Sequence, residues 1–283
     1  MCKVLKISQS SYFRWKKCPF SVRFHKKEEL KQRILTIYFD SKQRYGSPRI
    51  TAELNNLGFK ISRITVSKYM RELGIRSKLS KKFKITTDSK HGFYKSKDLL
   101  VNLEIKHAEQ VFVSDITYIK LASQHAYLAL VTDVYSKKIM GYKIDTNMRV
   151  QLVKDALEMA VKTRLYKHQN LIHHSDRGIQ YCCPDFADFA KSKNIILSTT
   201  QNSSPYENAV AERINGILKH EFGLNKTIPD LKTAQKMVKQ AIEIYNNDRR
   251  HCSLGMKTPE FAHVNQIHKY KSYKKNKIAI LVA

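Results

Sequence analysis

The central and C-terminal parts of the chain alternate between β-branched, aromatic-rich runs and segments whose apolar residues recur with helical spacing. The expected strands cover residues 111–121, 125–135, 138–144, 171–174 and 195–199, and the expected helices cover residues 150–165, 184–193, 205–222 and 228–247. Only short polar turns separate the first three strands, which predicts an antiparallel meander. Strands that then alternate with helices predict an α/β domain with helices on both faces of a mixed sheet.

The first 75 or so residues show a different pattern, that of short helices with basic faces. Ser47 is expected to cap a helix that ends at Gly58. After a short turn, Ser62 is expected to cap a second helix, residues 63–73. Two capped helices joined by a tight turn are typical of a helix-turn-helix unit.

The second of these helices carries side chains that a helix in the major groove of DNA needs. Arg63 and Lys68 lie on it among other polar residues, and Arg49 on the first helix is a third candidate for DNA contact. By pattern alone, a helical hairpin that makes no contact with DNA fits these residues equally well. An earlier stretch, residues 4–15, resembles the turn and second helix of another such unit.

The net charge favours the DNA-binding interpretation. The chain has 52 lysines and arginines against 24 aspartates and glutamates, a formal net charge of +28. Such an excess repels itself unless a polyanion neutralises it, and phosphate contacts supply most of the affinity in nucleic-acid complexes. We therefore expect DNA as the partner.

Other classes of protein fit the composition poorly. No apolar run approaches the roughly 20 residues that cross a bilayer, and the N-terminus lacks the pattern of a secretory signal. The five cysteines offer neither a Cys-x-x-Cys zinc pair nor an even disulfide framework. The expectation is a cytoplasmic protein without a membrane partner.

These patterns divide the chain into four regions. They are a helical, helix-turn-helix-like DNA-binding region (1–75), a basic linker (76–108), a core (109–225), and a helical extension with a basic tail (226–283). The element order of the core is that of an RNase H-like mixed sheet flanked by helices. The expected fold class is therefore α/β, preceded by an all-α region.

Two carboxylates are placed for phosphoryl-transfer chemistry. Transfer on DNA without a protein nucleophile uses two divalent cations about 4 Å apart, held by hard oxygen ligands. Asp115 lies inside an otherwise apolar strand, where a carboxylate is costly unless it binds something. Asp176 lies just past the next buried strand, although the surrounding Ser-Asp-Arg-Gly is also good turn chemistry. Both are candidate metal ligands.

A third ligand is sought on the helix expected at 205–222. Glu207 has a structural task in a capping box with Ser204, so it is not the first choice. At about 100° per residue, Glu212 points away from the apolar face, with Asn208 about 40° and Lys219 about 20° from it. Glu212 is therefore the expected ligand, with Asn208 and Lys219 placed to contact DNA.

The acids and their surroundings resemble the DDE transposases of insertion sequence family three and the retroviral integrases. That family separates its second and third acids by the 35 residues found here between Asp176 and Glu212, and it has a basic residue at the place of Lys219. Phe112 stands where the family usually has Trp, and Glu207 where it usually has Asp; neither departure touches the three acids. Five blocks carry the resemblance, at residues 45–50, 112–119, 174–181, 204–213 and 245–259.

The resemblance implies a catalytic subunit of a bacterial DNA transposase. Asp115, Asp176 and Glu212 would be its catalytic residues and would bind two Mg²⁺ (or Mn²⁺) ions. It would cleave the ends of an insertion sequence and join the freed 3′-hydroxyl to target DNA, without a covalent protein intermediate. The resemblance also implies a homo-oligomer on paired ends, an upstream helix-turn-helix frame product as a further partner, and association with the nucleoid.

Two alternative functions and several other polar residues remain to be weighed. A nuclease of the same fold would hydrolyse without joining, and a DNA-binding regulator would carry an inert core.

Asp133 is expected at a structural strand end, although it could lie opposite Asp115. His173 and His174 are adjacent on a strand and so face opposite ways. Simple solvated charges are expected at Asp145, Asp155 and Glu158.

Overall fold

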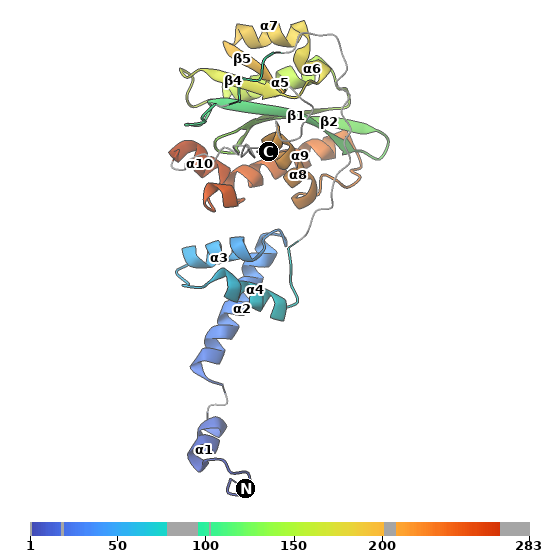
Figure 1. The fold of residues 1–283 in the computed structure, drawn as a ribbon. Helices are drawn as coiled ribbons and strands as arrows, with labels where there is room; N and C mark the ends of the chain where they lie inside the picture. Colours follow the sequence, from blue (N-terminus) through green and yellow to red (C-terminus); the bar gives the residue numbers. More distant parts are fainter. Residues whose placement is uncertain (1, 18–19, 78–95, 102, 201–207, 267–283) are drawn as a thin grey trace, which may run out of the picture. The chain divides into compact units, whose positions relative to one another are not determined.

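The computed structural model describes residues 2–17, 20–77, 96–101, 103–200 and 208–266 (Figure 1). The chain divides into two compact units, residues 1–79 and 80–283, and each is described by itself. The cap that Ser204 would form with Glu207, the middle of the basic linker and the basic run of the tail lie outside the described residues. None of the helices in the described ranges combines the length and apolar character of a bilayer-crossing segment.

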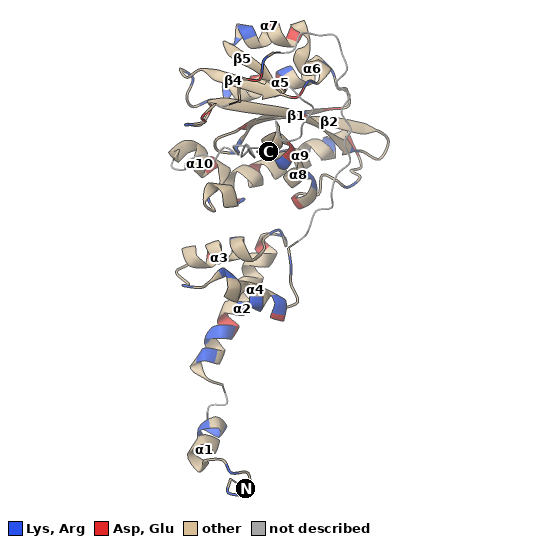
Figure 2. Cartoon of the chain, viewed as in Figure 1, with Lys and Arg blue, Asp and Glu red and all other residues tan. Residues whose placement is uncertain are grey.

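The N-terminal unit is helical. Its helices are α1 (Gln9–Lys17), α2 (Val22–Asp40), α3 (Ser47–Asn56) and α4 (Arg63–Glu72). At 19 residues, α2 is longer than the short helices expected from the sequence. The last three helices share an apolar core made of Ile34, Tyr38, Tyr45, Ile50, Leu54, Val66 and Met70. Lysine and arginine positions are spread over α1, α2 and α4 (Figure 2).

The pair α3–α4 has the expected start and stop signals, with one correction. Ser62 caps α4, since its Oγ accepts a hydrogen bond from the Thr65 amide at 3.2 Å. Gly58 and Gly74 follow the two helices with φ of 90° and 68°, which glycine adopts without strain. The cap of α3 is Gly46 and not Ser47, which is already the first helical residue.

The second unit is built on a five-stranded mixed sheet. Its strands are β1 (Val111–Lys120), β2 (His125–Asp133), β3 (Ile139–Asp145), β4 (Leu171–Ser175) and β5 (Ile195–Thr199). The order across the sheet is β3-β2-β1-β4-β5. The first three strands form the expected antiparallel meander, and β4 and β5 continue the sheet in parallel with β1. This is the RNase H-like arrangement that the sequence predicts.

Helices cover both faces of the sheet (Figure 1). One face holds α5 (Val150–Lys162), α6 (Ile179–Cys182) and α7 (Pro184–Ser192), which bury their apolar residues against the strands. The other face holds α8 (Ala209–Glu221) and α9 (Leu231–Asn247), which form a second core with the meander. A short 3-10 turn (Cys252–Leu254) and α10 (Pro259–Asn265) complete the described chain. The helix flanks predicted for the fold are therefore present.

Gly141 shows how closely α5 lies on the meander. A Cβ at this position of β3 would lie 2.1 Å from the Ala156 carbonyl oxygen and 2.6 Å from the Ala160 nitrogen. No side chain fits in that space, so only glycine allows the helix to pack at this distance.

The start of α9 corrects the helix expected from residue 228. Ile228 forms an isolated parallel bridge with Leu121, and its amide donates to the Lys120 carbonyl at 2.9 Å. Asp230 then caps the helix by accepting from the Thr233 amide at 2.8 Å. Ile228 therefore pairs with the residues that follow β1 and does not begin the helix.

The strand register excludes Asp133 from the surroundings of Asp115. Phe112 pairs with Asp133, whereas Asp115 pairs with Leu130. Asp133 instead ends β2 in a buried network, where it accepts from the Glu109 amide at 3.0 Å and the Ser136 amide at 2.9 Å. This is the structural strand end that the sequence favours.

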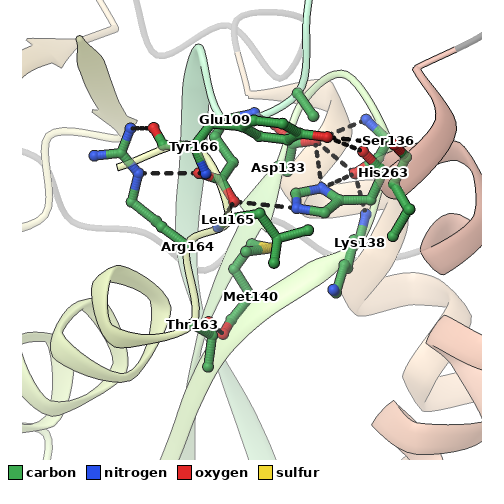
Figure 3. A network of polar contacts seen from close by, with 12 residues as sticks. Glu109, Asp133, Ser136, Lys138, Met140, Thr163, Arg164, Leu165, Tyr166 and His263 are labelled. Atoms are coloured by element: carbon green, nitrogen blue, oxygen red, sulfur yellow. Dashed lines mark hydrogen bonds and ion pairs between the residues drawn. The ribbon is translucent and has the colours of Figure 1, made fainter. Parts of the chain in front are cut away.

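The same network anchors α10 to the sheet (Figure 3). His263 of α10 lies between two buried acids, with Nε2 3.1 Å from Glu109 Oε1 and Nδ1 3.4 Å from Asp133 Oδ2. Glu109 also pairs with Arg164 at 3.1 Å. Burial lowers the pKa of His263, but the hydrogen bonds and charges of the two acids outweigh it and hold this pKa above its ordinary value.

Candidate active site

Asp115 lies in the middle of β1 and contacts the middle of α8. Its Oδ2 accepts a hydrogen bond from Asn215 Nδ2 at 2.7 Å. Burial and the charges of Asp176 and Glu212 together raise the pKa of Asp115 to about 7, against the opposing effect of the Asn215 hydrogen bond. A buried carboxylate held by an amide beside two other acids is poised to accept a cation.

Asp176 lies beside Asp115 because of the parallel pairing of two strands. Ser114 of β1 pairs with Ser175 of β4, so the two aspartates follow paired residues on neighbouring strands. The Gly178 amide donates to Asp176 Oδ1 at 3.0 Å, which is the turn chemistry recognised in the sequence. Asp176 therefore both stabilises the turn and is a candidate metal ligand.

Glu212 reaches the two aspartates from α8. It lies in the first turn of that helix, and burial together with the charge of Asp176 raises its pKa. Its side of the helix is the exposed one, as the helical spacing predicts. Asp115, Asp176 and Glu212 thus come from three different elements and lie within electrostatic range of one another.

Asn208 has a different place from the one expected. It is 6% exposed and precedes α8, where its Nδ2 donates to the Ser114 carbonyl at 3.0 Å. This bond ties the start of α8 to β1 next to Asp115. A side chain so buried is not available to DNA in this structure.

Lys219 lies two turns beyond Glu212 and faces the site. Burial lowers its pKa, and the charge of Asp115 opposes that shift, which shows that the ammonium is within electrostatic reach of this carboxylate. It is half-buried, so part of it remains accessible. Of the stripe expected from the helical wheel, Glu212 and Lys219 lie as expected and Asn208 does not.

Asn215 and Tyr181 are two polar residues that sequence reasoning missed. The Asn215 Oδ1 and the Tyr181 hydroxyl are buried atoms without a hydrogen-bond partner in the described part of the chain. Burial and the charges of Asp176 and Asp115 raise the pKa of Tyr181, which places its hydroxyl near the acids. Asn215 could have been found by its helical spacing of three residues from Glu212.

The other polar residues considered in the sequence have structural partners. His173 Nε2 lies 2.7 Å from Ser114 Oγ, and His174 Nδ1 lies 2.8 Å from Ser198 Oγ, so the two rings face different strands. Asp155 pairs with Lys143 at 3.0 Å, and Glu158 pairs with Lys162 at 3.0 Å. These residues are not part of the acidic site.

The candidate DNA contacts of the N-terminal unit lie on its surface or near it. Arg63 and Lys68 are exposed on α4. Arg49 on α3 is partly covered, because its guanidinium lies 5.4 Å from the centre of the Tyr45 ring and its Nη1 donates to the Arg44 carbonyl at 3.4 Å. It is therefore less accessible than the other two.

The donor set fits divalent cations. The three carboxylates supply hard oxygen ligands and excess negative charge, since the charge of Asp176 raises the pKa of both Asp115 and Glu212, and the Asn215 Oδ1 is a further unused oxygen. Within the described ranges, no three acidic, histidine or cysteine side chains are already drawn together closely enough to enclose an ion. Mutual repulsion of this kind is what a bound cation relieves.

Family comparison gives an independent view of both units. An integrase core domain family matches residues 106–205, a second integrase core domain family matches residues 193–259, and an HTH-like domain family matches residues 25–83. The integrase matches cover all three acids, and the HTH-like match covers α3 and α4.

Two relatives match the chain over nearly its whole length. It is 33% identical over 266 residues to the transposase InsF for insertion sequence IS3A of Escherichia coli, covering 92% of the chain and 91% of the relative. It is also 33% identical over 261 residues to an uncharacterized 31 kDa protein of insertion element IS600 from Shigella sonnei, covering 92% of the chain and 96% of the relative.

Solved structures of viral integrases are among the similar folds. The HTLV-2 integrase catalytic core domain matches 56% of the chain and 97% of its own length, with 19% identity and a TM-score of 0.45. A simian T-cell lymphotropic virus intasome chain matches 86% of the chain and 78% of its own length, with 16% identity and a TM-score of 0.49. On the identity and coverage shared with the insertion-sequence relatives, the chain belongs to the IS3 family of transposases, enzymes that transfer DNA strands.

Proposed function

We propose that Asp115, Asp176 and Glu212 are the catalytic residues and together bind two divalent cations, Mg²⁺ or Mn²⁺. In this proposal one site first cleaves the end of the insertion sequence and then joins the freed 3′-hydroxyl to target DNA. The observation that supports it most is that three carboxylates, from β1, the end of β4 and α8, lie within electrostatic range of one another. The charge of Asp176 raises the pKa of both Asp115 and Glu212. No protein nucleophile is required, so no covalent intermediate is expected.

The chain's own residues prepare the site in distinct ways. Asn215 fixes the orientation of Asp115, and the Gly178 amide fixes that of Asp176. Glu212 sits on the exposed side of α8, where it can close on a ligand without leaving a packed core. When bound, the cations activate the attacking oxygen and stabilise the leaving oxygen.

Lys219 completes the site on its DNA side. Its partly buried ammonium lies within electrostatic reach of Asp115 and can hold the phosphate beside the scissile bond. The revised role of Asn208 is to position β1 against α8 through the Ser114 carbonyl. We propose that it makes no direct contact with DNA.

The N-terminal unit is proposed to recognise the ends of the element. Its HTH-like match, its exposed Arg63 and Lys68, and the capped α3–α4 pair support this role. By analogy with the family, we further propose a homo-oligomer on paired DNA ends, with the product of an upstream helix-turn-helix frame as a possible fusion partner. Because the substrate is DNA, we propose that the protein acts at the nucleoid in the bacterial cytoplasm.

A single assay separates this function from the two alternatives. The purified chain is incubated in Mg²⁺ with a duplex that carries an end of its insertion sequence, together with target plasmid. Nicked and joined strands are both expected. Nicked strands alone would favour a nuclease, and binding without either product would favour a regulator with an inert core.

Asn215→Ala is expected to slow cleavage about 10-fold to 100-fold, the range found when a group supporting a metal ligand is lost. Loss of the amide donor raises the pKa of Asp115 above about 7, so the pH profile should move to higher pH and more Mg²⁺ should be needed for half-maximal rate. Rates measured across pH and Mg²⁺ concentration test this.

The matched control is Asn246→Ala. Asn246 is also a buried asparagine, but its amide bonds both backbone groups of Ile139, away from the acids. This variant should lose thermal stability and keep the wild-type pH profile and Mg²⁺ requirement. Identical profiles for the two variants would reduce Asn215 to a packing residue.

Replacing both Arg63 and Lys68 with Ala should weaken binding to the element's ends by about tenfold or more and make it less dependent on salt. Metal-dependent cleavage at saturating DNA should change little, because the acids lie in the other unit. Gel-shift titration at two salt concentrations measures the effect. Unchanged end binding would make the α3–α4 pair structural.

A further inference from the structure

Ile64 is the most exposed large apolar side chain of the α3–α4 pair, at 82% of its surface. The sequence groups it with Val66 and Met70, which are 0% and 6% exposed in the core. On a helix with about 100° per residue, Ile64 lies on the side of α4 opposite these two residues. An isoleucine in this position gives no packing energy to the fold.

The residues that share this side of α4 are basic. Lys68 and Arg71 follow Ile64 at i+4 and i+7 and are both exposed, so the three side chains form one stripe along the helix. The only acid of α4, Glu72, is neutralised by Lys27 at 2.8 Å and Lys31 at 3.2 Å from α2. The stripe therefore presents one apolar group followed by two positive charges that pair with no acid among the described residues.

The place of Ile64 along α4 matters as much as its direction. It is the second residue after the Ser62 cap, at the N-terminal end of the second helix of the pair. In helix-turn-helix proteins the N-terminal residues of this helix contact base edges, while basic residues elsewhere hold the phosphates. The apolar group that a base edge offers in the major groove is the C5-methyl of thymine.

We propose that Ile64 contacts the methyl group of a thymine in the ends of the element, with Lys68 and Arg71 holding the adjoining phosphates. This rests on the proposed role of α4 in DNA binding and deepens it by naming the base chemistry that is read. It makes Ile64 a specificity-determining residue and the basic side chains positioning residues.

The test removes the contact from each side in turn, by replacing thymine in the DNA and Ile64 in the protein. A duplex with the terminal inverted repeat of the encoding element is prepared, with each thymine in turn replaced by deoxyuridine, and binding is measured to wild type and Ile64→Ala. At one or more positions the replacement should weaken wild-type binding about fourfold, the factor expected for one buried methyl group. At the same positions Ile64→Ala should bind both duplexes equally.

The matched control is Leu57→Ala, which removes another exposed apolar side chain, 61% exposed at the end of α3. It should respond to deoxyuridine as wild type does, and thermal unfolding should show both variants fully folded. The thymine contact is overturned under two joint conditions. Every deoxyuridine replacement changes the binding of Ile64→Ala as much as that of wild type, and the variant that lacks Arg63 and Lys68 still loses end binding. It is equally overturned if Ile64→Ala changes only the oligomeric mass in light scattering. Failure of the basic variant to lose end binding would instead overturn the DNA-binding role of α4.

Discussion

Asp115→Asn, Asp176→Asn and Glu212→Gln are each expected to reduce end cleavage and strand joining by more than about a thousandfold. An amide keeps the shape of the side chain but loses the charge that attracts a divalent cation. Binding of end DNA should stay within about threefold of wild type, because phosphate contacts dominate affinity. Activity within tenfold of wild type for one variant would remove that residue from the site.

The thermal stability of Asp115→Asn as a function of pH provides a second test of the role of Asp115. The folded-state pKa of about 7 lies above the ordinary value of 3.8, so the wild-type chain loses stability as pH rises from the lower value to the higher one. Without metal, Asp115→Asn should therefore unfold at a higher temperature than wild type above pH 7, and this advantage should vanish near pH 4. The control Glu158→Gln, on the surface of α5 beside Lys162, should change neither activity nor this pH dependence.

Lys219→Ala is expected to lower cleavage at saturating DNA by about a hundredfold, far more than the loss of one ordinary phosphate contact. Its ammonium lies within electrostatic reach of Asp115, and in our proposal it holds the DNA end beside the acids. Lys219→Arg should restore part of the rate. Single-turnover cleavage with end DNA in excess measures both.

Lys236→Ala is the matched control for Lys219. Lys236 is an exposed lysine on α9, opposite the buried Val238 and Tyr245. Its loss should change affinity slightly and the single-turnover rate hardly at all. Equal losses of rate for the two variants would show that Lys219 belongs to the general basic surface.

The three candidate acids could be proposed from the sequence because their positions follow from local patterns. Asp115 interrupts an apolar strand, Asp176 ends one, and the helical wheel turns Glu212 away from the core. In the structure β1 and β4 are parallel neighbours, and Asn215 of α8 donates to Asp115, which places the helix beside β1. The mixed sheet itself followed from the order of strands and helices.

Hairpin register could not be read from the sequence. Strands β1 and β2 are joined through Leu121–Gln124, a run without the Asn-Gly or Gly-containing pair that fixes a turn type. A symmetrical turn about residue 124 places Asp133 opposite Asp115, but the observed register pairs it with Phe112. A small displacement of the turn thus moves a carboxylate from the active site to the network around His263.

The helical-wheel placement was also wrong for Asn208, because this residue precedes α8. Asn208 has φ of −119° and ψ of 31°, so the rotation of about 100° per residue does not apply to it. Its side chain turns inward to the Ser114 carbonyl, a long-range contact that no local pattern contains. Asn215 was overlooked for a related reason, since its importance depends on a strand 100 residues earlier in the chain.

The most direct measurement of the central claim is anomalous diffraction from crystals of the full chain bound to end DNA and Mn²⁺. Two peaks about 4 Å apart are expected, each within ligand distance of carboxylate oxygens of Asp115, Asp176 or Glu212. Crystals of the Glu212→Gln variant under the same conditions should lose at least one peak. Peaks located elsewhere in the chain, or DNA-bound crystals without a peak at these three residues, would contradict the account.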